Sequence, residues 1–258
     1  MHLCTYCYSG ENMKKIFEYI GCFALIIFSF YFTDKISLLV ASKSNLMEEI
    51  KMVSSSFNKK PIDAQINAKE NTIIPGSNGR EVNEEESYIS MKEFGFFNKE
   101  HLVYNSIKPK YTLYNNRDKY IISGNPSRRN VSLIVDDNLD ISTYLRAQKI
   151  DFDEIVKESK TEVFGEVISG AKGIFSEKSL CIYNYSDIDD CKKKGYFIIK
   201  PNITLNASSI ITVKDQIKAG SLILISNSAT CEHVKALLRE IKYKDLNIVY
   251  VSKLISEE

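Results

Sequence analysis

The chain has 258 residues, enough for one ordinary domain with additions or for two small domains. Its 34 Lys and Arg residues nearly balance its 33 Asp and Glu residues, and a net charge of +1 disfavours a dedicated nucleic-acid-binding protein. A hydrophobic fraction of 44% and a charged fraction of 26% argue against wholesale disorder and against a multi-span membrane protein. Six Cys are too few for a small disulfide scaffold.

Near the N-terminus, residues 16–33 (IFEYIGCFALIIFSFYFT) form an apolar run in which Glu18 is the only charged residue. Such a run reaches the lower limit for spanning a hydrocarbon core of about 30 Å. Lysines on its N-terminal side favour an inside N-terminus, with the bulk of the chain outside the cell membrane. We therefore expect residues 1–41 to hold a single-pass anchor. A cleaved signal peptide is the alternative, but no small-residue cleavage site follows the run.

The first twelve residues (MHLCTYCYSGEN) do not resemble a leader, whereas Met13 opens a basic and then apolar pattern. Translation from Met13 instead of Met1 is therefore a hypothesis, which N-terminal sequencing would test. In that case His2, Cys4 and Cys7 are not part of the protein, and a Cys-x-x-Cys without a second pair gives little support for a zinc site.

Two segments precede the main domain. Residues 42–70 are polar and predict a stalk, and residues 71–118 predict a small accessory block that contains the turn signals Pro75-Gly76 and Asn78-Gly79. The elements expected in these segments are helices at 45–57 and 85–93 and strands at 102–104 and 111–113.

From residue 119 to residue 258, apolar strands alternate with amphipathic helices. The expected strands are 120–123, 131–135, 180–183, 196–199, 221–225 and 247–251, and the expected helices are 140–147, 186–194, 213–218 and 229–241. Because the strands are continuous apolar runs, they predict a parallel sheet that is covered by helices on its faces. Residues 149–178 give no clear pattern. The predicted fold class is α/β.

In parallel α/β folds, functional side chains gather where the strands end. The polar residues that follow the expected strands form a candidate pocket: Asp136, Asp137, Asn138, Asn184, Asn202, Ser226 and Asn227.

Two of these strand ends resemble a known family. Residues 124–138 (GNPSRRNVSLIVDDN) resemble the opening of the polysaccharide deacetylase (NodB-homology) family, in which a strand ends in an Asp-Asp pair followed by Gly. Residues 217–255, with the run Gly-Ser-Leu-Ile-Leu-Ile, resemble that family's C-terminal part, approximately I-x-x-G-S-I-I-L-L-H-D. The resemblance covers residues 119–258 and implies a distorted (β/α) barrel.

By this resemblance, Asp136 corresponds to the general base and Asp137 to a metal ligand, with two further ligands expected from a His-x-x-x-His pair. The bound ion, zinc for example, polarises an acetamide and activates water, and a His after the last barrel strand protonates the leaving amine. The implied activity is hydrolysis of acetamido carbon–nitrogen bonds in polysaccharide.

The chain departs from this pattern at several positions. Its only histidines are His2, His101 and His233, which form no His-x-x-x-His pair, and it contains no Trp. Ser226 stands where the catalytic His belongs, and Asn227 and Asn138 replace the neighbouring Asp and Gly. Catalytic zinc sites usually have three protein ligands, and loss of a proton donor costs about 10²–10⁴-fold in rate.

We therefore expect a catalytically degenerate, bacterial deacetylase-like protein that needs no metal or other cofactor. Its expected role is to bind or organise cell-envelope glycan, or to bind a protein partner. One alternative is an active metal-dependent N-deacetylase with an atypical site. Another is an α/β interaction module without a glycan role.

Several of the conspicuous residues also have purely structural explanations. An Asp pair at a strand end can cap the next helix, and acidic residues at 187–190 fit the first turn of a helix. Cys231 and His233 are two residues apart on an expected helix, so their side chains diverge. Cys181 and Cys191 can form a disulfide only if their Cα atoms lie close together.

Overall fold

A computed structural model describes residues 19–32, 44–155, 180–184 and 186–258. The chain divides into two compact units, an N-terminal unit (Met1–Lys59 and Arg80–Asn105) and a sheet unit (Lys60–Gly79 and Ser106–Glu258). This division differs from the expected boundaries, because the expected stalk and accessory block each contribute residues to both units.

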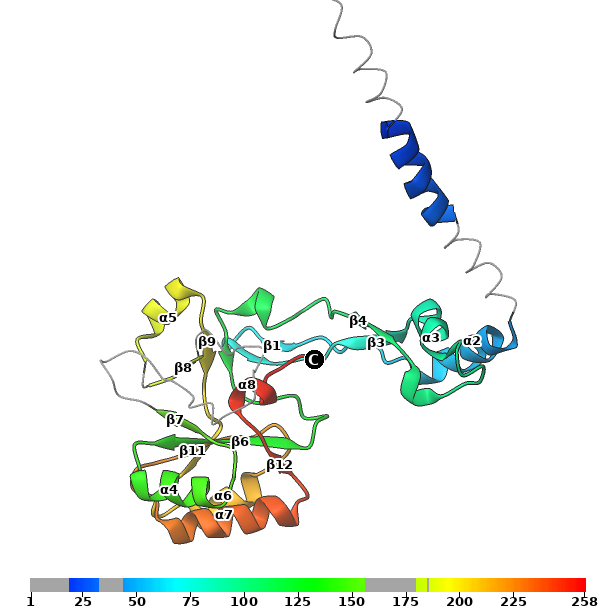
Figure 1. Cartoon of the computed structure of the whole chain (residues 1–258). Helices are drawn as coiled ribbons and strands as arrows, with labels where there is room; N and C mark the ends of the chain where they lie inside the picture. Colours follow the sequence, from blue (N-terminus) through cyan, green and yellow to red (C-terminus); the bar gives the residue numbers. More distant parts are fainter. Residues whose placement is uncertain (1–18, 33–43, 156–179, 185) are drawn as a thin grey trace, which may run out of the picture. The chain divides into compact units, whose positions relative to one another are not determined.

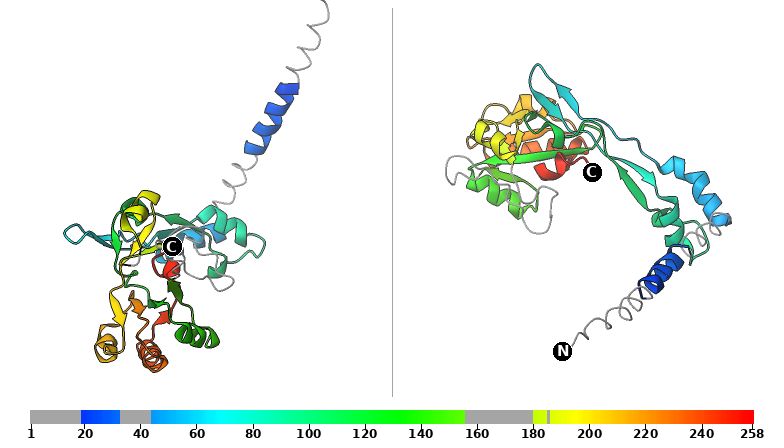
Figure 2. Two further views of the ribbon diagram at one scale, coloured as in Figure 1. Left: turned by 90° about the vertical axis from the view of Figure 1, so that its left-hand side faces the viewer. Right: turned by 90° about the horizontal axis from the view of Figure 1, so that it is seen from above.

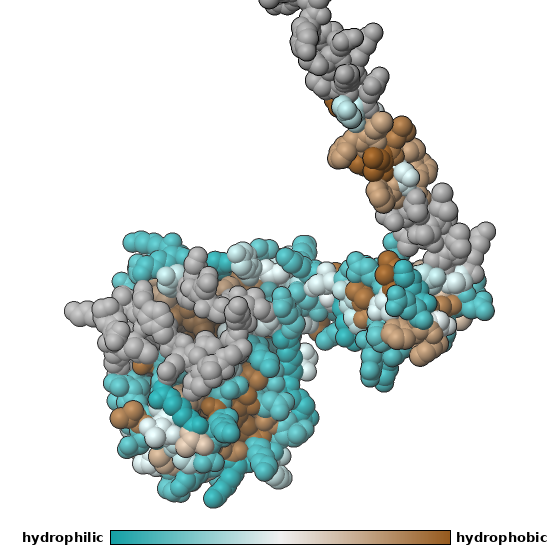
Figure 3. All heavy atoms as spheres, in the orientation of Figure 1, coloured by the Kyte–Doolittle hydropathy of each residue, from teal (hydrophilic) through white to brown (hydrophobic). Residues whose placement is uncertain are grey.

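Residues 19–32 form the first helix (blue in Figure 1), and its side chains are exposed and mostly apolar (Figure 3). Among the described residues, no helix is both long enough and apolar enough to cross a membrane. Residues 16–18 and 33 of the expected anchor lie outside the described residues.

The N-terminal unit is built around two helices. Its elements are α2 (Asn45–Phe57), α3 (Glu84–Met91) and η1 (Lys99–His101), together with parts of the paired strands β3 (Gly79–Val82) and β4 (Tyr104–Ile107), which cross its boundary. Ser44 caps α2 by accepting from the backbone N–H of Met47, and Asn83 caps α3 in the same way. Ile50 of α2 is fully buried against this unit's core, so the expected helix is confirmed but belongs to a packed unit.

Two five-stranded sheets organise the sheet unit (Figure 1). The first has the order β1-β2-β5-β9-β8, with bounds Gln65–Asn67, Thr72–Ile74, Tyr120–Ile121, Phe197–Ile199 and Leu180–Ile182. The second has the order β10-β11-β6-β12 with β7 also on β6, and bounds Ile203–Leu205, Leu222–Ile225, Asn130–Asp136, Asn247–Ile248 and Asp153–Ile155. All pairs except β1–β2 are parallel, as expected. No ladder among the described strands closes them into the predicted barrel.

Alternate residues of the central strands face two different cores. In β6, Ile134 faces the core between the two sheets, whereas Leu133 and Val135 face the helices. The covering helices are α4 (Leu139–Ala147), α6 (Ile210–Gln216) and α7 (Cys231–Tyr243), which lie side by side in the left view of Figure 2. Burial on both faces explains why these strands are continuous apolar runs.

A short helix and a disulfide cover the outer face of the first sheet. Helix α5 (Ile188–Lys194) begins after Asp187, whose side chain accepts from two backbone N–H groups, and ends at Gly195 with φ of 70°. The Gly stop was expected, but the predicted cap, Ser186, instead accepts from the N–H of Ile182. Cys181 of β8 and Cys191 of α5 form a disulfide, with their Cα atoms 6.3 Å apart.

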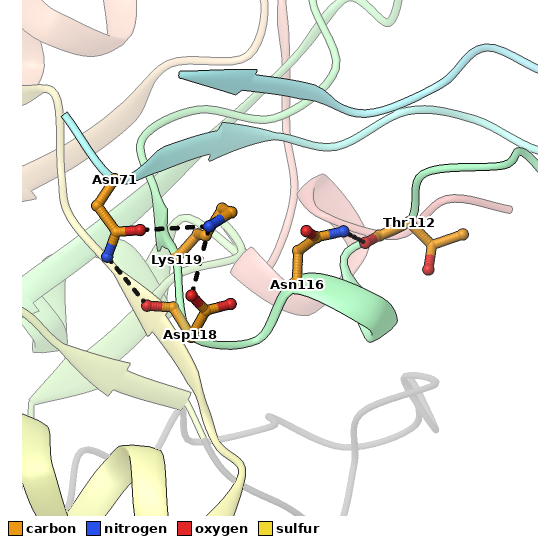
Figure 4. Close-up of polar contacts among 5 residues, drawn as sticks. All are labelled: Asn71, Thr112, Asn116, Asp118 and Lys119. Atoms are coloured by element: carbon orange, nitrogen blue, oxygen red, sulfur yellow. Dashed lines mark hydrogen bonds and ion pairs between the residues drawn. The ribbon is translucent and has the colours of Figure 1, made fainter. Parts of the chain in front are cut away.

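A polar contact ties β2 to β5 where both strands begin (Figure 4). Asn71, which has φ of 53°, donates from Nδ2 to the carbonyl of Asp118 and accepts from Lys119 Nζ. Asn116 is the last residue of the 3-10 helix η2 (Tyr114–Asn116), and its Nδ2 donates to the carbonyl of Thr112, which precedes that helix. These contacts hold the start of the first sheet in register.

Candidate functional site

The candidate site lies where β6 and β11 end. Ile225 pairs with Val135 in the parallel ladder, so Ser226 and Asp136 occupy the next positions on neighbouring strands. Asp136 is buried and is two residues beyond Ile134, which places both on the face toward the core between the sheets. Asp137 lies outside the strand, is exposed and has a positive φ of 41°. The two carboxylates therefore have very different surroundings.

Asn138 joins the two strand ends directly. Its Oδ1 accepts from the N–H of Ile141 and so caps α4, while its Nδ2 donates to the carbonyls of Asn227 and Ala229, both at 3.2 Å. The side chain that replaces the family's Gly therefore links the start of α4 to the loop after β11.

Ser226 takes part in hydrogen bonds within its own loop. Its hydroxyl lies 3.3 Å from the Ser228 hydroxyl, donates to Asn227 Oδ1 at 3.4 Å and accepts from the backbone N–H of Ser228. A neutral hydroxyl cannot supply the proton that an imidazolium gives at neutral pH, since its own pKa is far higher.

Two predicted pocket residues lie elsewhere. Asn202 lies at the other end of β11, where it accepts from the N–H of Leu222, because the short strand β10 begins directly after it. Asn184 follows β8, which belongs to the first sheet, and has φ of 70°. Grouping Asn202 with Asp136 was therefore wrong, whereas Asn184 follows the carboxyl end of a strand in the other sheet.

Asn206 ends β10 on the same edge as Ser226, as the pairing of Leu205 with Ile225 shows. Its Oδ1 accepts from the N–H and the hydroxyl of Ser208. The sequence analysis did not identify Asn206 because it did not predict strand β10, whose three residues are too few to show a hydrophobic periodicity.

Asp153, which the sequence analysis did not identify, begins β7 and is buried. Burial raises its pKa to about 6, although the hydrogen bond from the N–H of Val251 opposes this shift. It falls within the stretch that gave no pattern, so no sequence signal marked it. Its carboxyl group lies beside helix α8 (Val251–Leu254), not at the strand-end edge.

Of the two described histidines, His233 lies in the first turn of α7, a helix that begins directly after the loop that follows β11. His233 belongs to the capping box of α7, where its Nδ1 accepts from the backbone N–H of Thr230, and His101 contacts Ser90 in the N-terminal unit. His2 lies outside the described residues. The hydrogen bonds of His233 thus serve to cap the start of α7.

The metal ion that the family resemblance implies does not fit the residues at the edge. Among the described part of the chain, no group of three or more His, Cys, Asp or Glu side chains is placed to hold a metal. The amide and hydroxyl groups of Asn138 and Ser226 are engaged in helix and loop hydrogen bonds. The hydrogen bonds of Asn138 and Ser226 cap helix α4 and connect the loops at this edge.

The Asn138 link predicts a measurable contribution to stability. Asn138→Ala removes an N-cap and two cross-loop hydrogen bonds, so we expect the free energy of unfolding to fall by about 2 kcal/mol. Asn227→Ala is the matched control, because its exposed side chain can be removed while its bridged carbonyl stays. Urea denaturation measures both, and equal losses in the two variants would contradict the link.

The sequence is similar to a curated bacterial protein over part of its length. No family model matches the sequence. A segment of 97 residues is 37% identical to the uncharacterized protein YlxY of Bacillus subtilis (strain 168), covering 38% of this chain and 30% of that protein. The matched segment thus spans less than a third of the relative's length.

Similarity in fold extends further. The CE4 family pseudoenzyme BA3943 from Bacillus anthracis superimposes with a TM-score of 0.53 and 16% identity, covering 83% of this chain and 96% of that structure. A BA3943 mutant described as having restored enzymatic activity gives a TM-score of 0.52, also at 16% identity, and covers 83% of this chain and 99% of its own. The chain therefore has a polysaccharide deacetylase-like fold of the NodB type.

Proposed function

We propose that this chain is a membrane-anchored, extracytoplasmic protein whose deacetylase-like domain binds or organises cell-envelope glycan, or binds a protein partner, without hydrolysing its ligand. The similarity to a pseudoenzyme supports the degenerate domain at the level of the fold. The envelope location and the ligand class are parts of the proposal that extend beyond this similarity.

The observation that carries the proposal is the hydrogen bonding at the edge formed by β6 and β11. Asn138 and Ser226 are neighbours of the acidic pair, and their polar atoms bind the loops on either side. In the deacetylase family that the sequence resembles, those positions hold a Gly and the catalytic imidazole. Because the polar atoms of Asn138 and Ser226 make hydrogen bonds within the loops, these residues favour a structural role at this edge over proton transfer.

Two features support the envelope location. The helix at residues 19–32 exposes almost only apolar and aromatic side chains, as a membrane-embedded segment does. The Cys181–Cys191 disulfide is typical of proteins that mature in an oxidising compartment. We propose that residues 16–33 anchor the chain and that residues 44–258 lie outside the membrane.

Hydrolysis is the decisive test. The full chain in detergent, incubated with Zn²⁺ or Co²⁺ and N-acetylated chitooligosaccharides, is expected to release acetate at the buffer rate. Ser226 follows β11 where the catalytic imidazole is expected, and the imidazole of His233 is engaged in the capping box of α7. Asp136→Ala is expected to give the same rate. Acetate release that this substitution abolishes would overturn the proposal and favour the active-enzyme alternative.

A second experiment distinguishes the ligand classes. Cosedimentation of the full chain with purified peptidoglycan is expected to retain the protein, and soluble chitooligosaccharides are expected to compete. Absence of retention on peptidoglycan would assign the role to a protein partner or to an interaction module without a glycan role.

A further inference from the structure

Residues Val251–Glu257 run as a strap through the sheet unit. Val251, Leu254 and Ile255 are fully buried in the core between the two sheets, and Leu254 lies against the backbone of Gly124. At its far end, the strap receives a hydrogen bond of 2.8 Å from Arg128 Nη1 to the carbonyl of Ser256. The strap therefore closes the inter-sheet core and is held by segments that are distant in sequence.

At its beginning, the strap depends on a carboxyl group from another element. Helix α8 has Tyr250 at its N-cap, and this side chain makes no capping hydrogen bond. Asp153 replaces the missing cap, because its Oδ2 accepts from the N–H of Val251 at 2.8 Å in a buried position.

The ladder explains why Asp153 is in this place. On one edge of β6, β12 pairs with residues 130–131 and β7 pairs with residues 134–136. The chain leaves this edge after Val249 to form α8, and Asp153 begins β7 just beyond that gap. The carboxyl group of Asp153 therefore lies where the strap departs from the sheet.

A second carboxyl group holds the end of the strap. Oε1 of Glu257 accepts from the N–H of Leu113 at 3.0 Å, and the main-chain carbonyl of Glu257 accepts from the N–H of Asn78. The Glu257 carboxyl group also accepts from the backbone N–H of Gly76 and faces the guanidinium of Arg128. Both ends of the strap are thus attached through acidic side chains, of which that of Asp153 is buried and that of Glu257 is partly buried.

We propose that the strap Val251–Glu257 is a pH-sensitive clasp, in which the buried carboxyl group of Asp153 favours the closed strap when it is protonated and destabilises it on ionisation, because a buried carboxylate loses its hydration. Release of the strap exposes Val251, Leu254 and Ile255 and opens the core between the two sheets.

The direction of the effect follows from the surroundings of the two groups. Burial raises the pKa of Asp153 to about 6, and the nearby charge of Asp151 adds to this shift. Burial also raises the pKa of Glu257, while backbone N–H groups and Arg128 oppose the shift. A group whose pKa is higher in the closed state stabilises that state at low pH, and this contribution is lost as the pH rises through the closed-state pKa.

Hydrogen–deuterium exchange of the strap amides in the full chain tests the clasp. With a pKa of about 6 when closed and 3.8 when open, the strap-opening equilibrium constant, corrected for intrinsic exchange, is expected to rise roughly tenfold from pH 5 to pH 7.5. Asp153→Asn keeps an oxygen acceptor for Val251 but cannot ionise, so most of this rise is expected to disappear.

Asp140→Asn, at an exposed acid of α4, is the matched control and is expected to keep the wild-type rise. An opening constant that is independent of pH in the wild type, or a full rise in Asp153→Asn, would overturn the clasp. If Asp153→Asn does not fold, Asp151→Asn provides the test, since loss of the neighbouring charge is expected to reduce the rise.

Discussion

Replacing Gly220 with alanine is expected to destabilise the sheet unit by about 3–5 kcal/mol. Gly220 has φ of 87°, and a Cβ atom built there would lie 2.5 Å from the carbonyl oxygen of Gly124. Backbone strain at positive φ costs roughly 1–3 kcal/mol, and a forced overlap in a packed interior costs a similar amount. The N–H of Gly124 donates to the carbonyl of Gly220 at 2.8 Å, so the two backbones cannot separate without losing this bond.

Gly195→Ala is the matched control for this prediction. Gly195 has φ of 70°, but the nearest atom to a Cβ there is Arg117 Nη1, at 3.5 Å and on a flexible side chain. Only the backbone strain remains, so a loss of roughly 1–2 kcal/mol is expected. Denaturant midpoints of the two variants should differ clearly, and equal losses would show that the close backbone approach at Gly220 does not matter.

The strongest sequence patterns located the centre of the fold correctly. The runs that form β6 and β11 were identified from apolar continuity alone, because strands buried on both faces leave no polar alternation. Gly195 was identified as a helix stop because a left-handed residue there favours glycine. These predictions depend on local physics, which the local sequence contains.

What the sequence did not show depends on partners that are distant in the chain. The residues between 58 and 70 looked like a stalk because their pairing partners come from other segments; Ile62, for example, pairs with Ser77. The strand β10 is only three residues long, so Asn202 looked like a strand end when it is a strand beginning. Asp153 gave no signal because its role depends on Val251, 98 residues away.

Only part of the candidate site could be predicted from the sequence, because the rest depends on contacts between segments that are distant in the chain. The ends of β6 and β11 were placed together by the family resemblance, and the ladder pairs them. The contacts of Asn138 with the carbonyls of Asn227 and Ala229 could not be foreseen, since they require knowledge of how the loop after β11 turns. A Gly at this position could not make these contacts, so the link depends on the Asn138 side chain.

Removing the disulfide is expected to lower the free energy of unfolding of the sheet unit by about 3 kcal/mol. Cys181 and Cys191 are separated by 10 positions, and closing a loop of this size restricts the unfolded chain by roughly that amount. Both Cys residues are buried beside Ile198, so Ser at these positions also places hydroxyl groups in an apolar cluster. The Cys181→Ser, Cys191→Ser double variant is therefore expected to lose at least the free energy of unfolding that the disulfide contributes.

Reduction of the wild-type chain separates the two contributions, because it breaks the bond without adding hydroxyl groups. Reduced protein is expected to lose about 3 kcal/mol in urea denaturation, and the double variant is expected to lose more. Cys231→Ser serves as the control, since Cys231 is a free, partly exposed thiol and its replacement should change stability by less than roughly 0.5 kcal/mol. If reduction left the midpoint unchanged, the cross-link would not stabilise the fold, and the outer cover of the first sheet would depend on packing around Ile198 alone.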